Sequence, residues 1–267
     1  MTAISHSSLA RSALAAGALW GGLAHAVPVN VAVTIQNLAP TNSVSFAPLH
    51  LGFNSGVFDS FNIGQVATAP IISVAEGGSG SDWQPAFAAA DPGAVRGTLG
   101  GALLPGMSNS MSFTVDPVAN RFFTFASMVV PSNDFFIGND SPTQYALFSA
   151  GGAQQISSIT VRASDIWDAG SEVFDPAAAA FLMIGNNNLR TAQNSVVSLN
   201  FGELAGFNGL TTAPGYVFNS GLAANSDVYR ISFSVSPVPE PQTLALMLAG
   251  LLGIGWLTQR RRASIAG

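Results

Sequence analysis

The chain has 267 residues, and its composition excludes several classes of protein. It contains no cysteine, so disulfide bonds do not hold it together. Between Val27 and Ser236, thirteen acidic residues stand against five arginines (five minus thirteen), a formal charge of −8. An acidic domain without basic clusters argues against binding to nucleic acid and to anionic lipid surfaces, because both require cations opposite phosphate groups. His50 is the sole histidine of this stretch, which leaves little room for catalytic dyads or zinc sites.

The first residues have the pattern of a secretory signal peptide. Arg11 precedes the apolar run Ser12–Leu23, which ends at the small residues of Ala24-His25-Ala26. A basic start, an apolar stretch of this length and an A-x-A triplet are typical of exported precursors. We therefore predict that residues 1–26 are a signal peptide cleaved after Ala26, and that residues 27–236 form a single domain.

Short apolar runs with period-two alternation follow, which indicates half-buried β-strands. Met111, Phe113 and Val115 are expected to face inward, and the apolar run Phe122–Val130 to be a central strand covered on both sides or by loops. Strands at this spacing, joined by irregular loops, predict an all-β fold, an antiparallel two-sheet β-sandwich. In chain order, the clearest strands are Val29–Gln36, Ser110–Val115, Phe122–Val130, Ile159–Arg162, Val196–Phe201 and Tyr229–Val235.

Two segments have helical composition, Ala86–Ala90 and Ala177–Met183. Pro85 and Pro176 stand just before them and suit the first turn of a short helix. We expect both helices to be connectors and not a second layer.

Three features follow one another at the end of the chain. The proline-rich Pro237-Val238-Pro239-Glu240-Pro241 precedes the uncharged stretch Thr243–Leu257, and Arg260-Arg261-Arg262 comes next. A helix over the uncharged stretch would rise about 22 Å, so it spans a hydrocarbon core of ~30 Å only marginally. The arginines are expected to stay in the cytoplasm, which places the domain outside the inner membrane.

These features resemble a PEP-CTERM sorting signal. Pro239, Glu240 and Pro241 correspond to its short motif, and Arg260, Arg261 and Arg262 to its basic end. The resemblance implies that residues 237–267 cross the inner membrane transiently and are recognised by an exosortase-type protease of a Gram-negative bacterium. Release to the cell surface or the exopolysaccharide matrix would follow. A permanent membrane anchor is the alternative.

Two acidic turns follow predicted strands. Asp134 comes shortly after Phe122–Val130, and Asp168-Ala169-Gly170-Ser171-Glu172 comes shortly after Ile159–Arg162. Loops of a sandwich cluster at its rims, so Asp134, Asp168 and Glu172 can meet there and offer carboxylates to Ca²⁺, which prefers oxygen ligands. Gly170 would let its loop fold back. The alternative is local turn chemistry, since Asp and Asn are common in turns whatever their function.

Blocks in the same order resemble the spondin N-terminal domain family. The resemblance covers about Val29–Asp175 and implies a sandwich related to C2 domains that binds one calcium ion through acids at Asp134, Asp168 and Glu172, with Asp165 and Asp175 ranked below them. The matching parts are Val29–Leu38, Phe46–His50, Ala75–Gly77, Phe125–Gly138 and Trp167–Glu172.

The residues and resemblances together predict a calcium-binding adhesion or matrix module and not an enzyme, with exopolysaccharide or surface proteins as partners. One alternative is a secreted polysaccharide hydrolase in which paired carboxylates, such as Asp165 and Asp168, act as acid and base. Another is a purely structural envelope protein with an empty site. His50 is expected to be a loop or core histidine. Trp83 and Trp167 are expected to be packing or rim aromatics rather than a platform for sugar binding.

Overall fold

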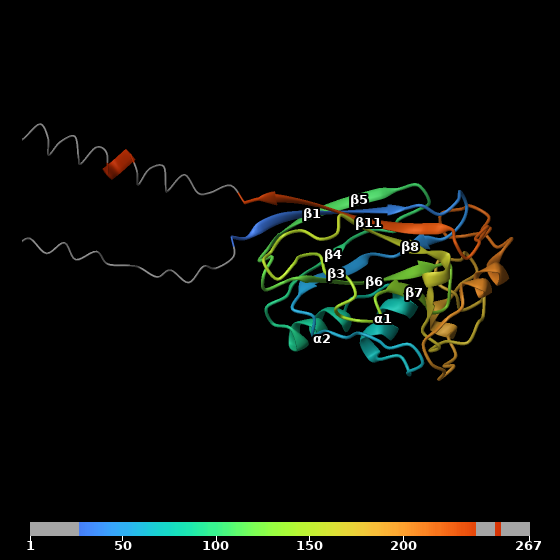
Figure 1. Ribbon diagram of the computed structural model, residues 1–267. Helices are drawn as coiled ribbons and strands as arrows, with labels where there is room; N and C mark the ends of the chain where they lie inside the picture. Colours follow the sequence, from blue (N-terminus) through green and yellow to red (C-terminus); the bar gives the residue numbers. More distant parts are fainter. Residues whose placement is uncertain (1–26, 239–248, 252–267) are drawn as a thin grey trace, which may run out of the picture.

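The computed structural model describes residues 27–238 and 249–251, and its folded part consists of two packed antiparallel sheets (Figure 1). The predicted antiparallel two-sheet sandwich is confirmed, since the strand pairings are antiparallel. The smaller sheet has the order β5 (Ser108–Val115), β1 (Val29–Asn37), β11 (Asp227–Pro237), β8 (Ser158–Arg162). The larger sheet has the order β10 (Ser198–Leu199), β9 (Trp167–Asp168), β7 (Phe135–Gly138), β6 (Phe122–Val130), β3 (Leu49–Asn54), β4 (Val95–Leu99), and β2 (Ser45–Phe46) pairs with β6.

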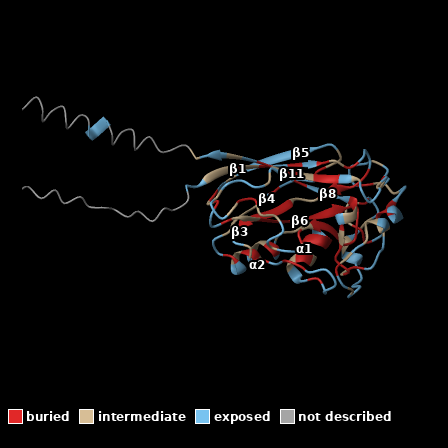
Figure 2. Cartoon of the chain, in the orientation of Figure 1, coloured by how far each residue is buried: buried red, intermediate tan, exposed pale blue. Residues whose placement is uncertain are grey.

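The main core lies between the two sheets (Figure 2). Val31 and Val33 of β1 alternate with more exposed residues and are fully buried against the larger sheet. Phe123 of β6 meets Phe233 of β11 edge-on across the core, with ring centroids 4.8 Å apart. Apolar burial of this kind holds a domain that has no disulfide bonds.

A helical layer covers the outer face of the larger sheet. The prediction that helices serve as connectors and not as a layer is wrong, because a second apolar cluster lies between this face and two helices, α1 (Ala69–Gly77) and α2 (Trp83–Ala90). The prediction that β6 is covered on both sides is confirmed. Phe123 belongs to the core between the sheets, whereas Ala126 belongs to the cluster under the helices.

Gly52 of β3 allows α2 to approach the sheet closely. A Cβ atom at this position would clash with the ring of Phe87 of α2. Phe87 in turn stacks on Phe58, with ring centroids 4.2 Å apart. The missing side chain on the strand therefore makes room for an aromatic side chain of the helix.

Two predicted elements differ from the structure. The segment Val196–Phe201 forms only the two-residue strand β10 before the 3₁₀-helix η3 (Phe201–Phe207) begins. The segment Ala177–Met183 is a series of turns in which Ala180 and Leu182 form isolated bridges to other loops. These long-range pairings override the helical composition of its alanines. Two further 3₁₀-helices are η1 (Ala163–Asp165) and η2 (Asn187–Leu189).

β5 buries less of its surface than predicted. Met111 is 41 % exposed and Phe113 is partly buried, whereas Val115 is buried as expected. The reason is that β5 is an edge strand of the smaller sheet.

We predict that Met111→Ser changes the free energy of unfolding by less than about 0.5 kcal/mol, the usual range for surface changes. Urea denaturation measures this, and a loss of about 2 kcal/mol or more, as for a core side chain, would contradict it.

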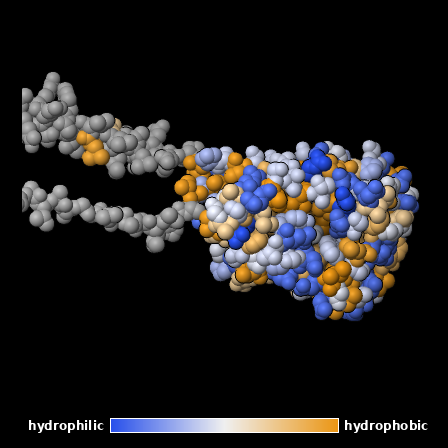
Figure 3. All heavy atoms as spheres, in the orientation of Figure 1, coloured by the Kyte–Doolittle hydropathy of each residue, from blue (hydrophilic) through white to orange (hydrophobic). Residues whose placement is uncertain are grey.

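Both ends of the described domain leave it at one pole. Val29 of β1 pairs with Pro237 of β11, so the first and last strands end side by side (Figure 1). Hydrophobic residues gather where the terminal segments join the domain (Figure 3), and Val27 at that junction is 71 % exposed. Residues 163–226 lie at the opposite pole (Figure 1).

Candidate metal-binding rim

The pairing of β7 with β9 brings the two acidic turns together. Phe135 lies opposite Asp168, and the amide nitrogen of Ala169 donates to the carbonyl oxygen of Asp134 at 3.2 Å. Asp134 stands directly before β7 and therefore lies beside Asp168. The structure thus places both turns at one rim of the sandwich.

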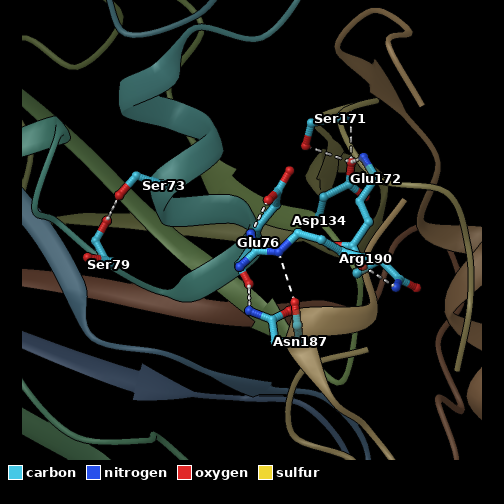
Figure 4. Close-up of polar contacts among 9 residues, drawn as sticks. Ser73, Glu76, Ser79, Asp134, Ser171, Glu172, Asn187 and Arg190 are labelled. Carbon is cyan, nitrogen blue, oxygen red and sulfur yellow. Dashed lines mark hydrogen bonds and ion pairs between the residues drawn. The ribbon is translucent and has the colours of Figure 1, made fainter. Parts of the chain in front are cut away.

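Asp134 binds the second acidic turn through its side chain. Its Oδ2 accepts hydrogen bonds from the amide nitrogens of Ser171 at 2.7 Å and Glu172 at 3.0 Å (Figure 4). Burial raises the pKa of Asp134 to about 6, and the charge of Asp168 adds to the rise, while the bonds from Glu172 and Ser171 oppose it. The carboxylate is thus less stable at this rim than in water, although two amides already stabilise it.

Asp168 is held by a tight turn. Its Oδ1 accepts from the amide nitrogen of Gly170 at 2.7 Å, and its Oδ2 accepts from Nδ2 of Asn200 at 3.2 Å. Gly170 has a φ of 63°, and a Cβ atom there would lie 2.7 Å from the carbonyl oxygen of Val196. Glycine is therefore required, both for the left-handed backbone and for the close approach of the neighbouring chain.

Glu172 is the most buried carboxyl group of the rim. It is 2 % exposed, and its Oε1 accepts from Nδ2 of Asn133 at 2.9 Å. Its Oε2 is buried and, within the part of the chain that the structure describes, has no hydrogen-bond partner. Burial raises the pKa of Glu172 to about 7. The charges of Glu76 and Asp134 add to the rise, and Asn133 and Arg190 oppose it. A buried acceptor without a partner is costly, and the described residues supply no donor or cation to Oε2 of Glu172.

Glu76 and Arg190 complete this region, and neither was predicted as a residue of the site. Glu76 lies at the end of α1, is 7 % exposed and forms an ion pair with Arg190 (Figure 4). Asn187 of η2 ties the two together, because its Nδ2 donates to the carbonyl oxygen of Glu76 at 3.1 Å and its own carbonyl oxygen accepts from Nε of Arg190 at 2.9 Å. Arg190 thus balances one charge of an acidic group comprising Glu76, Asp134, Asp168, Glu172 and Glu203.

The side chains of this rim are of the type that binds a hard cation, but their present positions do not form a binding site. Carboxylate oxygens in excess, one of them buried and unpartnered, are suitable ligands for Ca²⁺. However, within residues 27–238 no three carboxyl or imidazole side chains converge so that they can hold a metal ion. Asp134 directs Oδ2 to the amides of Ser171 and Glu172 in the second acidic turn, and Asp168 directs Oδ1 to the amide of Gly170 in its own turn. A cation bound by Asp134, Asp168 and Glu172 would therefore require these side chains to rotate.

The lower-ranked acids serve local turns. Asp165 accepts from the amide nitrogen of Arg162 at 3.0 Å, at the start of η1. Asp175 accepts from the amide nitrogen of Ala177 at 2.8 Å. Asp165 and Asp168 have separate hydrogen-bond partners, and no described hydrogen bond links them as an acid and base pair.

His50 is a buried histidine of β3. Its Nδ1 lies 3.0 Å from Oγ1 of Thr98, and its Nε2 lies 3.1 Å from the carbonyl oxygen of Gly78. Burial lowers its pKa, and the bond to Gly78 opposes the shift. It therefore favours the neutral form and has the core role that its sequence context indicated. Trp83 is also fully buried, as expected for a packing residue.

The predicted targeting segments fall mostly outside the described residues. Ala24 and Ala26 of the cleavage site lie there, and so do Pro239, Glu240, Pro241, Arg260, Arg261 and Arg262 of the sorting motif. Residues 249–251 of the apolar stretch are helical. Among the described residues, no helix has both the length and the apolar character needed to cross a membrane.

Comparison with known proteins identifies the end of the chain. Residues 237–262 match the family model described as a PEP-CTERM protein-sorting motif. No curated protein matches the chain. The matched range contains the proline and glutamate motif and the three arginines. The chain is therefore an exported cell-surface protein that carries a signal for sorting by an exosortase.

Proposed function

We propose that this exported protein is a calcium-binding adhesion module of the cell surface or the exopolysaccharide matrix, with a binding role and not an enzymatic one. The observation that carries the proposal is the meeting of Asp134, Asp168 and Glu172 at one rim, with Oε2 of Glu172 buried and unpartnered among the described residues. The resemblance of the chain to spondin N-terminal domains, which implies a calcium ion at these positions, supports it.

Electrostatics favours a divalent cation at the rim. Burial and mutual repulsion raise the pKa of Asp134 to about 6 and that of Glu172 to about 7, so both carboxylates are destabilised when ionised. A bound cation would reverse this by giving both groups an opposite charge. It would also give Oε2 of Glu172 the partner that it lacks.

The position of the rim at one end of the domain suits a binding role. The acidic turns belong to the pole opposite the termini (Figure 1), and the sorting motif follows β11 immediately. The apolar surface at the terminal pole (Figure 3) fits a position near a membrane, so the rim would point outward while the tail is held.

Thermal unfolding of the full-length protein in detergent, with calcium and with chelator, tests the proposal. Binding to the folded state stabilises it by about 2.7 kcal/mol when calcium is at a hundred times its Kd. We expect a clear rise of the midpoint with calcium and its loss in Asp168→Ala. Asp59→Asn is a matched control, since Asp59 is an exposed acid whose side chain bonds only to Asn62 among the described residues. A midpoint that does not respond to calcium would overturn the proposal.

A further inference from the structure

A pocket opens beside Trp167 of β9. It has a volume of about 230 Å³ and lies between β7, η1, β8 and β10. Successive side chains of a strand point to opposite faces, so β9 directs Trp167 into this pocket and Asp168 away from it. The pocket and the acidic rim are thus separate sites that share a short strand. The lining side chains are Gln144, Tyr145, Val161, Asp165, Trp167 and Leu199.

The aromatic wall of the pocket is held in place. Nε1 of Trp167 donates to the carbonyl oxygen of Gly138 at 3.1 Å, which fixes the indole ring. Its ring also packs edge-on against Phe61, with centroids 5.2 Å apart. Leu199, directly opposite Trp167 in the sheet, is 50 % exposed. The pocket therefore offers an apolar surface that is fixed in position.

The side chains of Tyr145 and Asp165 lie beside this aromatic wall and can form further hydrogen bonds. Nε2 of Gln144 donates to the hydroxyl oxygen of Tyr145 at 3.1 Å, so the proton of that hydroxyl is free to be donated. Each oxygen of Asp165 accepts one bond, from Arg162 or Ser164, and retains a lone pair. Burial, and then the charge of Asp165, raise the pKa of Tyr145, so its hydroxyl keeps its proton.

We infer that this pocket binds a single neutral pyranose unit of a polysaccharide. The faces of a sugar ring carry C–H groups that pack on aromatic side chains, and its edge carries hydroxyls that pair with carboxylate, amide and phenol groups. The volume lies below the ~300–1,000 Å³ of pockets for drug-sized ligands, so one ring fits better than a larger ligand. The negative charge of Asp165 disfavours phosphate groups and acidic sugars.

This inference rests on the adhesion role in the proposed function and names the class of ligand for that role. Sugar binding at the pocket does not require calcium at the rim. Trp167 reports on the pocket directly, because the other tryptophan of the described domain, Trp83, is fully buried. In the full-length protein, Trp20→Phe and Trp256→Phe remove the two tryptophans of the terminal segments. The remaining quenching by acrylamide then comes from Trp167.

The experiment is a titration of this protein in detergent with glucose, galactose, N-acetylglucosamine and glucuronic acid, followed by acrylamide quenching. We expect at least one neutral sugar to protect Trp167, and glucuronic acid to bind at least about tenfold more weakly. Tyr145→Phe keeps the ring, removes the donor and should weaken binding about tenfold. Tyr216→Phe, which removes a hydroxyl that bonds to Ser43 and Ser45 elsewhere, is the matched control and should bind normally.

Each titration is run with calcium and with chelator. Protection of Trp167 in chelator supports the pocket even if the rim binds no calcium, so the failure of one proposal is distinguishable from the failure of the other. The inference is overturned if no neutral sugar protects Trp167, if glucuronic acid protects it equally, or if Tyr145→Phe binds as tightly as Tyr216→Phe.

Discussion

Glu172→Gln is expected to make the calcium-free protein more stable and to abolish its response to calcium. The carboxylate of Glu172 is 2 % exposed, its Oε2 has no partner among the described residues, and burial raises its pKa to about 7. Replacing it by a neutral amide of the same shape removes the cost of the buried charge, which we expect to be on the order of 1 kcal/mol at pH 7. Glutamine also lacks the charge that would attract calcium.

Thermal unfolding in chelator and in calcium at pH 7 measures both effects. The midpoint in chelator should rise, and the difference between the two midpoints should disappear. Asp59→Asn again serves as the matched control and should leave both midpoints unchanged. A Glu172→Gln protein that loses stability in chelator would show that the carboxylate is stabilising as it stands. A variant that keeps its calcium response would show that Glu172 is not a ligand.

The calcium-free protein is expected to lose stability as the pH rises from about 4 to about 7. The pKa of Asp134 is raised from 3.8 to about 6, and that of Glu172 from 4.5 to about 7. Between these values the folded protein binds more protons than the unfolded chain, so the free energy of unfolding falls with increasing pH. One pKa unit corresponds to 1.36 kcal/mol, and the two coupled groups together should cost on the order of 3 kcal/mol.

Calcium should oppose this fall of the free energy of unfolding with pH. Metal ions bind deprotonated carboxylates, so calcium competes with protons and its stabilising effect should grow with pH. We expect the midpoints in calcium and in chelator to coincide near pH 4 and to separate steadily toward pH 7. Glu172→Gln should flatten the curve in chelator. A chelator curve that rises over this range would contradict the destabilised carboxylates at the rim.

The strands that were predicted best are those whose pattern is local. β1 and β11 alternate apolar and polar residues, and β6 is a continuous apolar run, so their positions follow from the sequence alone. The helical layer was missed because α1 is apolar over most of its length and shows weak periodicity. The packing of both helices depends on residues of β3 and β6 that are distant in sequence. An example is Gly52 of β3, which lies beneath Phe87 of α2. The prediction of a helix over Ala177–Met183 was wrong for the opposite reason. The segment has helical composition, but it forms bridges with distant loops instead.

The rim was predictable only in part. Acids that follow strands are visible in the sequence, and the rule that loops cluster at sandwich rims was enough to place Asp134 beside Asp168 and Glu172. Glu76 was visible only as part of the Ala75–Gly77 block of the family resemblance. Nothing in the sequence pattern indicated that Arg190 and Asn200 belong to the rim. Both are loop residues that come close to it only in the tertiary fold. The sequence also gave no indication that amides already occupy oxygens of Asp134 and Asp168.

The most direct test of the calcium proposal is a crystal structure of the protein grown with calcium, with the ion located by its anomalous scattering. The proposal predicts one ion at the pole opposite the termini, about 2.3–2.6 Å from carboxylate oxygens of Asp134, Asp168 and Glu172, with these side chains rotated from their present bonds. A rim that holds no ion at saturating calcium, with Asp134 still bonded to the amides of Ser171 and Glu172, would contradict it.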